Sequence, residues 1–279
     1  RLTENNLSET WAAFSPDGQY IAFVVRGSDE HDGLYIMQAD GADAHRLTPG
    51  LINGEPSWSP DSQRLVFTRC GQVVDCVALV IDLDGSLYPL ANSGHAAWSP
   101  DGELIALNRR GDKREIHFVS PSGGEHQPVT ANTPATGYWY PRWSTDGQTL
   151  SYWAQDDTQD TDEWALTLLD VGMRTVRCQT ETQQHAAVFW GAWSPDGQAF
   201  AFFSQNQGQL SLQVINTTCE VQAEIEQVGW PVWSPDGALL LVLRNIDGIS
   251  DMYLVDLAGE ALYQLTDDVA IDIPMDWRP

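Results

Sequence analysis

One short motif that recurs along the whole chain constrains the fold more than any other feature. An aromatic residue precedes Ser, Pro, Asp and Gly, and an apolar run follows, as in Trp193-Ser194-Pro195-Asp196-Gly197. The motif aromatics lie 40 to 50 residues apart, at Phe14, Trp58, Trp98, Trp143, Trp193, Trp233 and, in a shortened last copy, Trp277. A repeat period in the forties predicts a series of similar supersecondary units.

Each repeat contains four short apolar runs separated by turn residues. In the first repeat the turns are Pro16-Asp17-Gly18 and Asp40-Gly41, and helical periodicity is absent throughout. Four short strands per repeat are typical of a β-propeller blade, which buries its two faces against neighbouring blades. We therefore expect an all-β chain that forms one propeller domain over residues 1–279, with four antiparallel strands per blade. The six blades are expected near residues 11–48, 55–90, 95–130, 139–179, 190–225 and 230–265.

The two ends of the sequence indicate how such a ring would close. Residues 1–3 match a fourth strand, and residues 274–279, which include the last motif copy, match a first strand. Overlapping termini of this kind suit a six-bladed ring, and a truncated seven-bladed ring is the alternative. The motif aromatics are interpreted as core residues between blades.

The motif also carries a family resemblance. Trp233-Ser234-Pro235-Asp236-Gly237, the later run Met252-Tyr253-Leu254-Val255-Asp256 and then Tyr263-Gln264-Leu265-Thr266 resemble the WD40-like PD40 repeat of TolB-like six-bladed propellers. The resemblance covers nearly all of the chain, with Phe14, Ser62 and Thr145 as departures. It implies a periplasmic propeller that binds protein partners. We find no counterpart of the α/β domain that precedes the propeller in TolB. Similar propellers occur in membrane sensors, in prolyl-oligopeptidase-like enzymes and in lyases.

The charge balance restricts the partners. The net charge is −25, and Lys113 is the only lysine among 14 basic residues. Such a chain repels phosphate backbones and anionic lipid surfaces, so neither a nucleic-acid partner nor direct membrane insertion is expected. No apolar run approaches the length of a membrane-spanning helix.

The four cysteines indicate the compartment. Cys70 and Cys76 flank a hairpin loop, whose closed ends make a disulfide geometrically easy. Cys178 and Cys219 are then the remaining pair, and four buried free thiols are the alternative. Two disulfides favour an oxidising compartment, periplasmic or extracellular. No cysteine or histidine spacing fits zinc.

A variable position three residues before each motif aromatic is the candidate ligand site. It is expected at the entrance of the central channel and holds Trp11, Glu55, His95, Tyr140, Trp190 and Trp230. Aromatic rings there predict a mouth that binds a sugar, a peptide or a cationic group by stacking and cation–π contacts. The alternative is that these rings only cap the core.

Acidic loops on the same predicted face raise the question of calcium. The densest carboxylate cluster is Asp156, Asp157, Asp160, Asp162 and Glu163, in which Asp157, Asp160 and Asp162 are the calcium candidates. Without a calcium-loop glycine or regular spacing, a solvated charge run is favoured over a metal site. Asp29, Glu30 and Asp32 form a sparser cluster. No catalytic motif and no cofactor motif is present. The sequence thus favours a non-enzymatic binding module for a protein partner or small ligand, with a lyase-, hydrolase- or peptidase-type propeller as the alternative.

Overall fold

The computed structural model describes residues 8–71, 76–110, 114–130, 137–155, 163–184, 191–206, 209–246, 249–258, 261–266 and 276. All regular structure in these ranges is β-strand, and adjacent strands pair antiparallel. None of the described residues form a helix long and apolar enough to cross a membrane. The chain divides into two compact units, residues 1–133 with 138–142 and residues 134–137 with 143–279.

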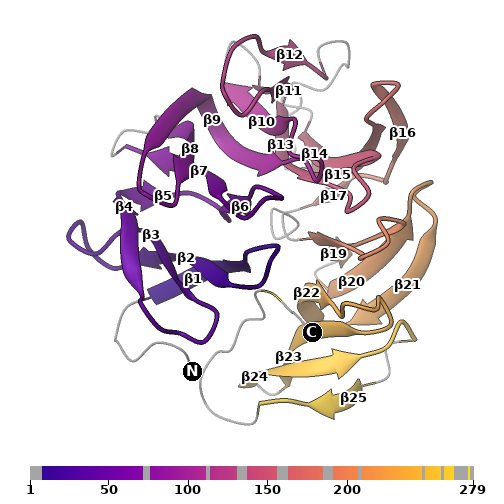
Figure 1. Cartoon of the computed structure of the whole chain (residues 1–279). Helices are drawn as coiled ribbons and strands as arrows, with labels where there is room; N and C mark the ends of the chain where they lie inside the picture. Colours follow the sequence, from indigo (N-terminus) through magenta and orange to yellow (C-terminus); the bar gives the residue numbers. More distant parts are fainter. Residues whose placement is uncertain are drawn as a thin grey trace. The chain divides into compact units, whose positions relative to one another are not determined.

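The first unit opens with a four-stranded sheet in chain order (Figure 1). Its strands are β1 (Ser8–Phe14), β2 (Tyr20–Arg26), β3 (Gly33–Gln38) and β4 (His45–Pro49). The next strands are β5 (Leu51–Ile52), β6 (Ser57–Trp58), β7 (Arg64–Cys70), β8 (Cys76–Asp82) and β9 (Leu87–Trp98). They are followed by β10 (Ile105–Arg110), β11 (Arg114–Val119) and β12 (Gln127–Pro128).

β9 differs from the sequence expectation. We expect separate strands near Leu87–Leu90 and Ala96–Trp98, but the structure has one strand whose first half pairs with β8 and whose second half pairs with β10. The carboxamide of Asn108, only 1% exposed, accepts hydrogen bonds from the N–H groups of Gly94 and His95 at 2.9 and 2.7 Å. These bonds satisfy the backbone where the ladder shifts register, so the strand continues through the change of partner.

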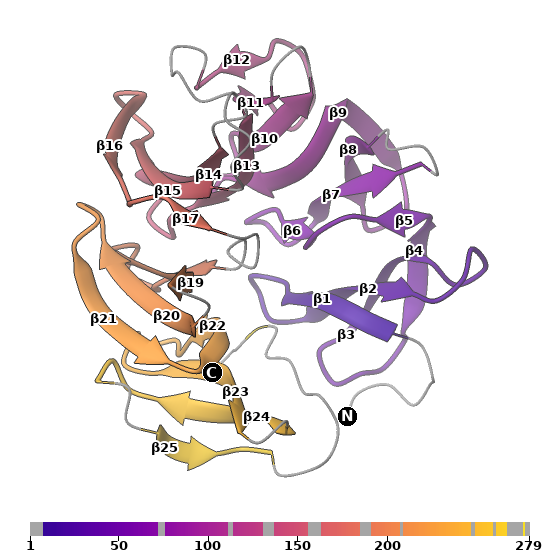
Figure 2. The same ribbon diagram turned by 180° about the vertical axis from the view of Figure 1, so that it is seen from behind.

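The second unit follows the same plan and is seen from behind in Figure 2. β13 (Gly137–Trp143) is shared between the two units. The second unit continues with β14 (Thr149–Gln155), β15 (Glu163–Asp170), β16 (Thr175–Gln179) and β17 (Gln183–Gln184). Two four-stranded sheets complete it: β18 (Gly191–Trp193), β19 (Ala199–Asn206), β20 (Gln209–Asn216) and β21 (Val221–Glu226), then β22 (Val228–Trp233), β23 (Leu240–Ile246), β24 (Ile249–Val255) and β25 (Ala261–Gln264).

The Ser-Pro-Asp-Gly turns are closed by their own side chains. Ser194 Oγ donates to Asp196 Oδ1 at 2.6 Å, and the same carboxylate accepts from the N–H of Gln198 at 3.0 Å. Ser194 Oγ in turn accepts from the N–H of Ala199 at 2.9 Å, and Gly197 takes the left-handed φ of 71° that the turn needs. The serine hydrogen bonds hold the pKa of the turn aspartates below the ordinary value at Asp17, Asp61, Asp101, Asp196 and Asp236.

Two of the motif tryptophans are bonded to the preceding repeat in the same way. Trp58 Nε1 donates to the carbonyl of Ala13, and Trp233 Nε1 donates to that of Ala192, both at 3.0 Å. Each acceptor immediately precedes the motif aromatic of the preceding repeat, so one residue both fills the core and fixes the register of neighbouring sheets. Within the first unit the core around Trp58 is made by strand residues such as Val24, Leu34 and Phe67.

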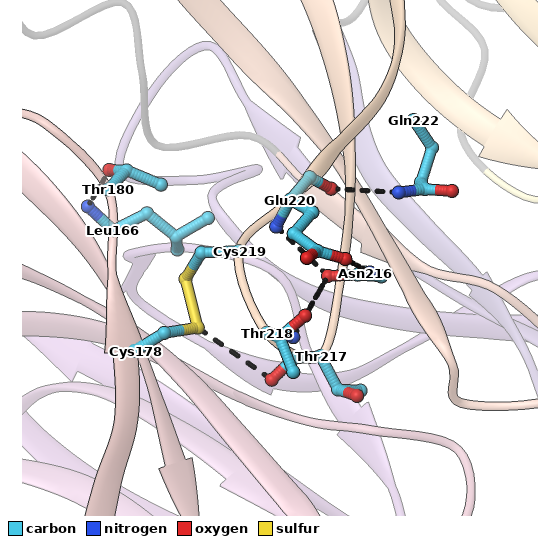
Figure 3. Close-up of a disulfide and its surroundings, with 9 residues drawn as sticks. All are labelled: Leu166, Cys178, Thr180, Asn216, Thr217, Thr218, Cys219, Glu220 and Gln222. Atoms are coloured by element: carbon cyan, nitrogen blue, oxygen red, sulfur yellow. Dashed lines mark hydrogen bonds between the residues drawn. A yellow bond between two sulfur atoms is a disulfide. The ribbon is translucent and has the colours of Figure 1, made fainter.

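Both cysteine pairs are bonded in the structure. Cys70–Cys76 closes the β7–β8 hairpin, and Cys178–Cys219 joins β16 to the turn between β20 and β21 (Figure 3). That turn is held by Asn216, whose Oδ1 accepts hydrogen bonds from the Thr218 N–H, the Thr218 hydroxyl and the Glu220 N–H at 2.8–2.9 Å. The disulfide therefore ties an outer strand to a turn that is already rigid.

Candidate functional site

The predicted site position has an unusual backbone. Trp11, Tyr140 and Trp230, each three residues before a motif aromatic, have φ values of 50°, 53° and 51°. In β1 and β22 this residue lies in a bulge, where the register shifts between Thr10 and Ala13 and between Gly229 and Val232. A bulky residue in the left-handed region costs about 1–2 kcal/mol, and glycine would occupy it without strain. The backbone conformation therefore does not require an aromatic side chain at these positions.

His95 and Tyr140 lie against each other in the first unit. Their ring centroids are 3.8 Å apart with the ring planes tilted by 40°. The backbone N–H of His95 is held by Asn108, whose own amide nitrogen reaches the carbonyl of Tyr138 at 3.4 Å. The buried Asn108 therefore positions both the strand that carries His95 and the strand that carries Tyr140.

Glu55 belongs to the same group of residues. Its Oε2 lies 2.8 Å from an Nη of Arg142, and the two side chains are 30% and 31% exposed. The preceding residue, Gly54, has φ 89°, and a Cβ there would come within 3.1 Å of the His95 ring. Asn53 donates to the carbonyl of Gly94 at 3.3 Å. The loop before β6 thus brings Glu55 beside the His95–Tyr140 pair.

Arginines cover the tryptophan faces of this region. The Arg26 guanidinium lies 4.4 Å from the ring centroid of Trp11, and Arg114 lies 5.1 Å from that of Trp139. Arg26 also donates to the carbonyl of Ile52 at 2.6 Å, at the end of β5 and three residues before Glu55. These are charge–quadrupole contacts, and they fix the cations over the rings.

The electrostatics follow from burial and these arginines. Burial, with the positive charges of Arg142 and Arg114, lowers the pKa of His95 to about 3, so the imidazole is neutral at physiological pH. Burial raises the pKa of Tyr140 even though the same two arginines oppose it, and burial raises the pKa of Tyr138 to about 12. We define Trp11, Arg26, Glu55, His95, Arg114, Tyr140 and Arg142 as the arginine–aromatic site.

The remaining predicted residues do not join this site. Trp230 is in the second unit, where its ring meets Phe203 edge to face with centroids 5.4 Å apart. Trp190 and the calcium candidates Asp157, Asp160 and Asp162 lie outside the described residues, as do residues 1–3 and all of 274–279 except Asp276. Asp32 is buried and accepts from the N–H groups of Gly27 and Ser28, which is a structural role. Within the described ranges no group of three His, Cys, Asp or Glu residues could hold a metal ion.

Sequence reasoning missed the arginines and Asn108. The predicted face was expected to be aromatic and acidic, yet around the four predicted positions of the first unit the described structure gathers three of the chain's 14 basic residues. The available signal was their placement: Arg26 ends β2, Arg114 begins β11 and Arg142 lies two residues after Tyr140. Strand ends are where side chains leave the ladder and reach a sheet edge.

Comparison with solved structures identifies the class of fold. The TolB structure from Acinetobacter baumannii superposes with a TM-score of 0.63 at 18% identity, covering 79% of this chain and 54% of that chain. An oligogalacturonate lyase from Vibrio parahaemolyticus gives a TM-score of 0.71 at 14% identity, covering 91% and 79%. A prolyl endopeptidase gives 0.65 at 12% identity, covering 95% and 43%. The chain therefore has a β-propeller fold.

Sequence comparison points to the same type of propeller. The Tol-Pal system protein TolB of Alcanivorax borkumensis is 38% identical over 69 residues, 24% of this chain and 15% of that protein. An uncharacterised peptidase of Bacillus subtilis, YuxL, is 27% identical over 155 residues, 54% of this chain and 22% of that protein. No family profile matches, and the aligned segments span less than a quarter of either relative. The chain is a TolB-like propeller in its fold, and its two disulfides indicate an oxidising compartment.

Proposed function

We propose that this chain is a non-enzymatic binding module of the periplasm or the extracellular space, and that it binds a protein partner or small ligand through the arginine–aromatic site. The observation that carries the proposal is the left-handed backbone of Trp11 and Tyr140. Strained residues persist where the surrounding structure holds them in place, and they cluster at functional sites. Trp11 and Tyr140 are half-buried, and the nearby Glu55 and Arg142 side chains are 30% and 31% exposed. Side chains held in this arrangement despite the backbone cost are suited to recognising a ligand.

The enzyme alternative rests on the likeness to oligogalacturonate lyase and to peptidases, which extends to the fold alone. The titratable groups of the site favour binding over acid–base catalysis. A histidine with a pKa of about 3 is a poor proton acceptor near pH 7, and phenols with raised pKa values remain protonated. Incubation with oligogalacturonate and with proline-containing peptides, followed by product analysis, is expected to show no turnover.

The binding proposal is tested with ligand-detected NMR on the whole chain against soluble saccharides and peptides, and with capture of periplasmic or secreted proteins. Trp11→Ala and Tyr140→Ala are expected to abolish the signals of the ligands that bind. Tyr88→Ala, which removes a 49% exposed tyrosine elsewhere in the first unit, is the matched control. If the two site variants bind every ligand as the unmodified chain does, the site is not the binding surface. Trp190→Ala and Trp230→Ala test the two predicted positions outside the arginine–aromatic site.

A further inference from the structure

Two histidines of the first unit lie beside each other at strand β12. His117 belongs to β11 and is only 6% exposed, and His126 immediately precedes β12. Their ring centroids are 6.2 Å apart, and the rings meet edge to face. β12 pairs with β11 over Gln127–Pro128 alone, whereas β4, β16, β21 and β25 have four to six residues at the equivalent place in their repeats. So short a strand depends on the side chains beside it.

Hydrogen bonds fix which nitrogen of each ring carries the proton. Nε2 of His117 lies 3.4 Å from Oε2 of Glu115. The ring of His126 bonds to the backbone carbonyl of Leu90 in β9. In both rings Nδ1 is buried and has no hydrogen-bond partner among the described residues. Each neutral imidazole therefore carries its proton on Nε2, where an acceptor is present, and leaves Nδ1 unprotonated.

The charges around the two rings come from the elements packed against them. The titratable and charged side chains there are Glu115 on β11, Arg109 on β10, Tyr138 on β13 and Glu125 next to His126. Burial lowers the pKa of His117 against the opposing effect of Glu115, and the positive charge of Arg109 lowers it further. Burial and Arg109 lower the pKa of His126 as well. The arrangement therefore disfavours a positive charge on either ring.

We propose that His117 and His126 form a pH-sensitive latch, which holds β12 on β11 near neutral pH and releases it in acid. A proton on Nδ1 of either ring creates a buried N–H that has no acceptor, and this N–H must reach water. Since Pro128 lies opposite His117 in the register, water reaches that ring when residues 126–128 move away from β11. The latch does not depend on the proposed function, because its residues are outside the arginine–aromatic site.

The direction of the pH dependence follows from the lowered pKa values. An imidazole on a released segment titrates near the ordinary 6.5, and in the closed latch both histidines bind protons less readily. The released state therefore takes up protons that the closed state does not, so the latch loses stability as the pH falls from 6.5 toward the lower pKa values. Each coupled histidine changes the opening equilibrium by up to about tenfold per pH unit. Histidine clusters act as switches in this pH range.

Hydrogen–deuterium exchange of the 279-residue chain at pH 7 and pH 5, corrected for the chemical exchange rate at each pH, measures the release. The amide of Val129 is the reporter, because it donates to the Ile116 carbonyl at 2.8 Å while the latch is closed. Exchange across residues 116–130 is expected to accelerate by about tenfold or more. The β19–β20 hairpin, which contains no histidine, is the internal reference and is expected to keep its protection.

Glutamine substitutions remove the titration. The double variant His117→Gln/His126→Gln retains side chains that form hydrogen bonds but cannot gain a proton, and it is expected to abolish the acceleration. Because His117 is buried, His126→Gln is also measured alone, and it is expected to abolish part of the acceleration. His45→Gln replaces an exposed imidazole of β4 and is the matched control, which should respond to acid as the unmodified chain does.

Two charge substitutions test whether protonation is the cause. Glu115→Gln removes the carboxylate that favours a charged His117, so the response to acid should grow. Arg109→Gln removes a positive charge that disfavours it, so the response should shrink. The inference is wrong if protection of residues 116–130 is unchanged at pH 5, if the double glutamine variant still responds, or if both charge variants change the response in the same direction. The proposed function is judged separately, by ligand binding to Trp11→Ala and Tyr140→Ala at neutral pH.

Discussion

In the candidate site, single residues adopt backbone conformations and protonation states that are unusual for their residue type. Trp11 and Tyr140 accept a left-handed backbone, and the imidazole of His95 is kept neutral by burial and by two arginines. Elsewhere glycines such as Gly197 supply the positive φ of the motif turns, but a left-handed φ also occurs outside the site, at Asp43, Ser62, Arg174, Cys219, Gln227 and Trp230. Conflict between local preference and observed conformation is expected where selection acts on binding as well as on stability.

The backbone strain at Trp11 can be measured by comparing two truncations. Trp11→Gly is expected to be more stable than Trp11→Ala by about 1 kcal/mol, because only glycine accepts φ near 50° without strain. At Trp98, where φ is not positive, the alanine variant should be more stable than the glycine variant by about 0.5–1 kcal/mol. Urea unfolding of the four variants measures both differences. An alanine variant of Trp11 that equals or exceeds the glycine variant would contradict the strain argument.

His95 should make folding stability depend on pH. Its pKa is lowered from the ordinary 6.5 to about 3 by burial and by Arg142 and Arg114. Between these values the unfolded chain binds a proton that the folded chain does not, so stability is lost as pH falls through that window. The slope reaches at most roughly 1.4 kcal/mol per pH unit.

Denaturant unfolding between pH 7 and pH 4 measures this slope. His95→Asn is expected to reduce it, and His45→Asn, which removes an exposed imidazole, is the control. An unchanged slope in His95→Asn would show that the imidazole titrates normally in the folded protein.

The strands and turns lie close to their predicted positions because the turn residues of each repeat mark where one strand ends and the next begins. The Ser-Asp hydrogen bonds recur at every described copy of the turn, as at Ser15–Asp17 and Ser234–Asp236. Strand β9 departs from the pattern because Asn108 supplies partners for backbone groups that would otherwise end the strand. Glycines also determine how closely a strand can pack against a neighbouring side chain. At Gly229 in β22, a Cβ would overlap the ring of Phe203.

Gly229→Ala is expected to destabilise the protein by about 1–3 kcal/mol, since the buried Phe203 ring must move. Gly172→Ala is the control, because its Cβ would lie 3.6 Å from Asp170 in ordinary contact, and it should change stability by less than about 0.5 kcal/mol. Adding Phe203→Leu to Gly229→Ala should recover part of the loss. If the added substitution recovers no stability, the loss comes from the backbone at residue 229 and not from overlap with the Phe203 ring.

At the scale of the whole molecule, the described strands include three four-stranded sheets and one larger sheet that contains β5 to β17, and the comparisons identify the fold as a β-propeller. That the ring has six blades and closes by residues 1–3 and 274–279 stays a prediction, because those ends lie outside the described residues. Between repeats, the indole bonds of Trp58 and Trp233 and the Cys178–Cys219 disulfide provide specific links.

The two disulfides should contribute unequally. Cys178–Cys219 spans 41 residues and Cys70–Cys76 spans 6. Loop-closure entropy in the unfolded chain predicts a loss of about 4 kcal/mol for Cys178→Ser/Cys219→Ser and about 2 kcal/mol for Cys70→Ser/Cys76→Ser. Guanidinium unfolding of the two double variants under oxidising conditions gives the comparison. Equal losses would mean that the larger loop is already restrained in the unfolded chain.

The sequence by itself determined the class of fold and most of the strand pattern, and it predicted the positions around which the candidate site is defined. Each of these follows from local periodicity, since turn residues and alternating strands act over a few neighbours. The tertiary structure decided the chemistry of the site. Arg142 meets Glu55 across 87 residues, and His95 meets Tyr140 across strands that Asn108 holds together. Such pairings depend on which strand ends share an edge, and no local signal encodes them, so the change from an acidic to an arginine-lined site appears only in the fold.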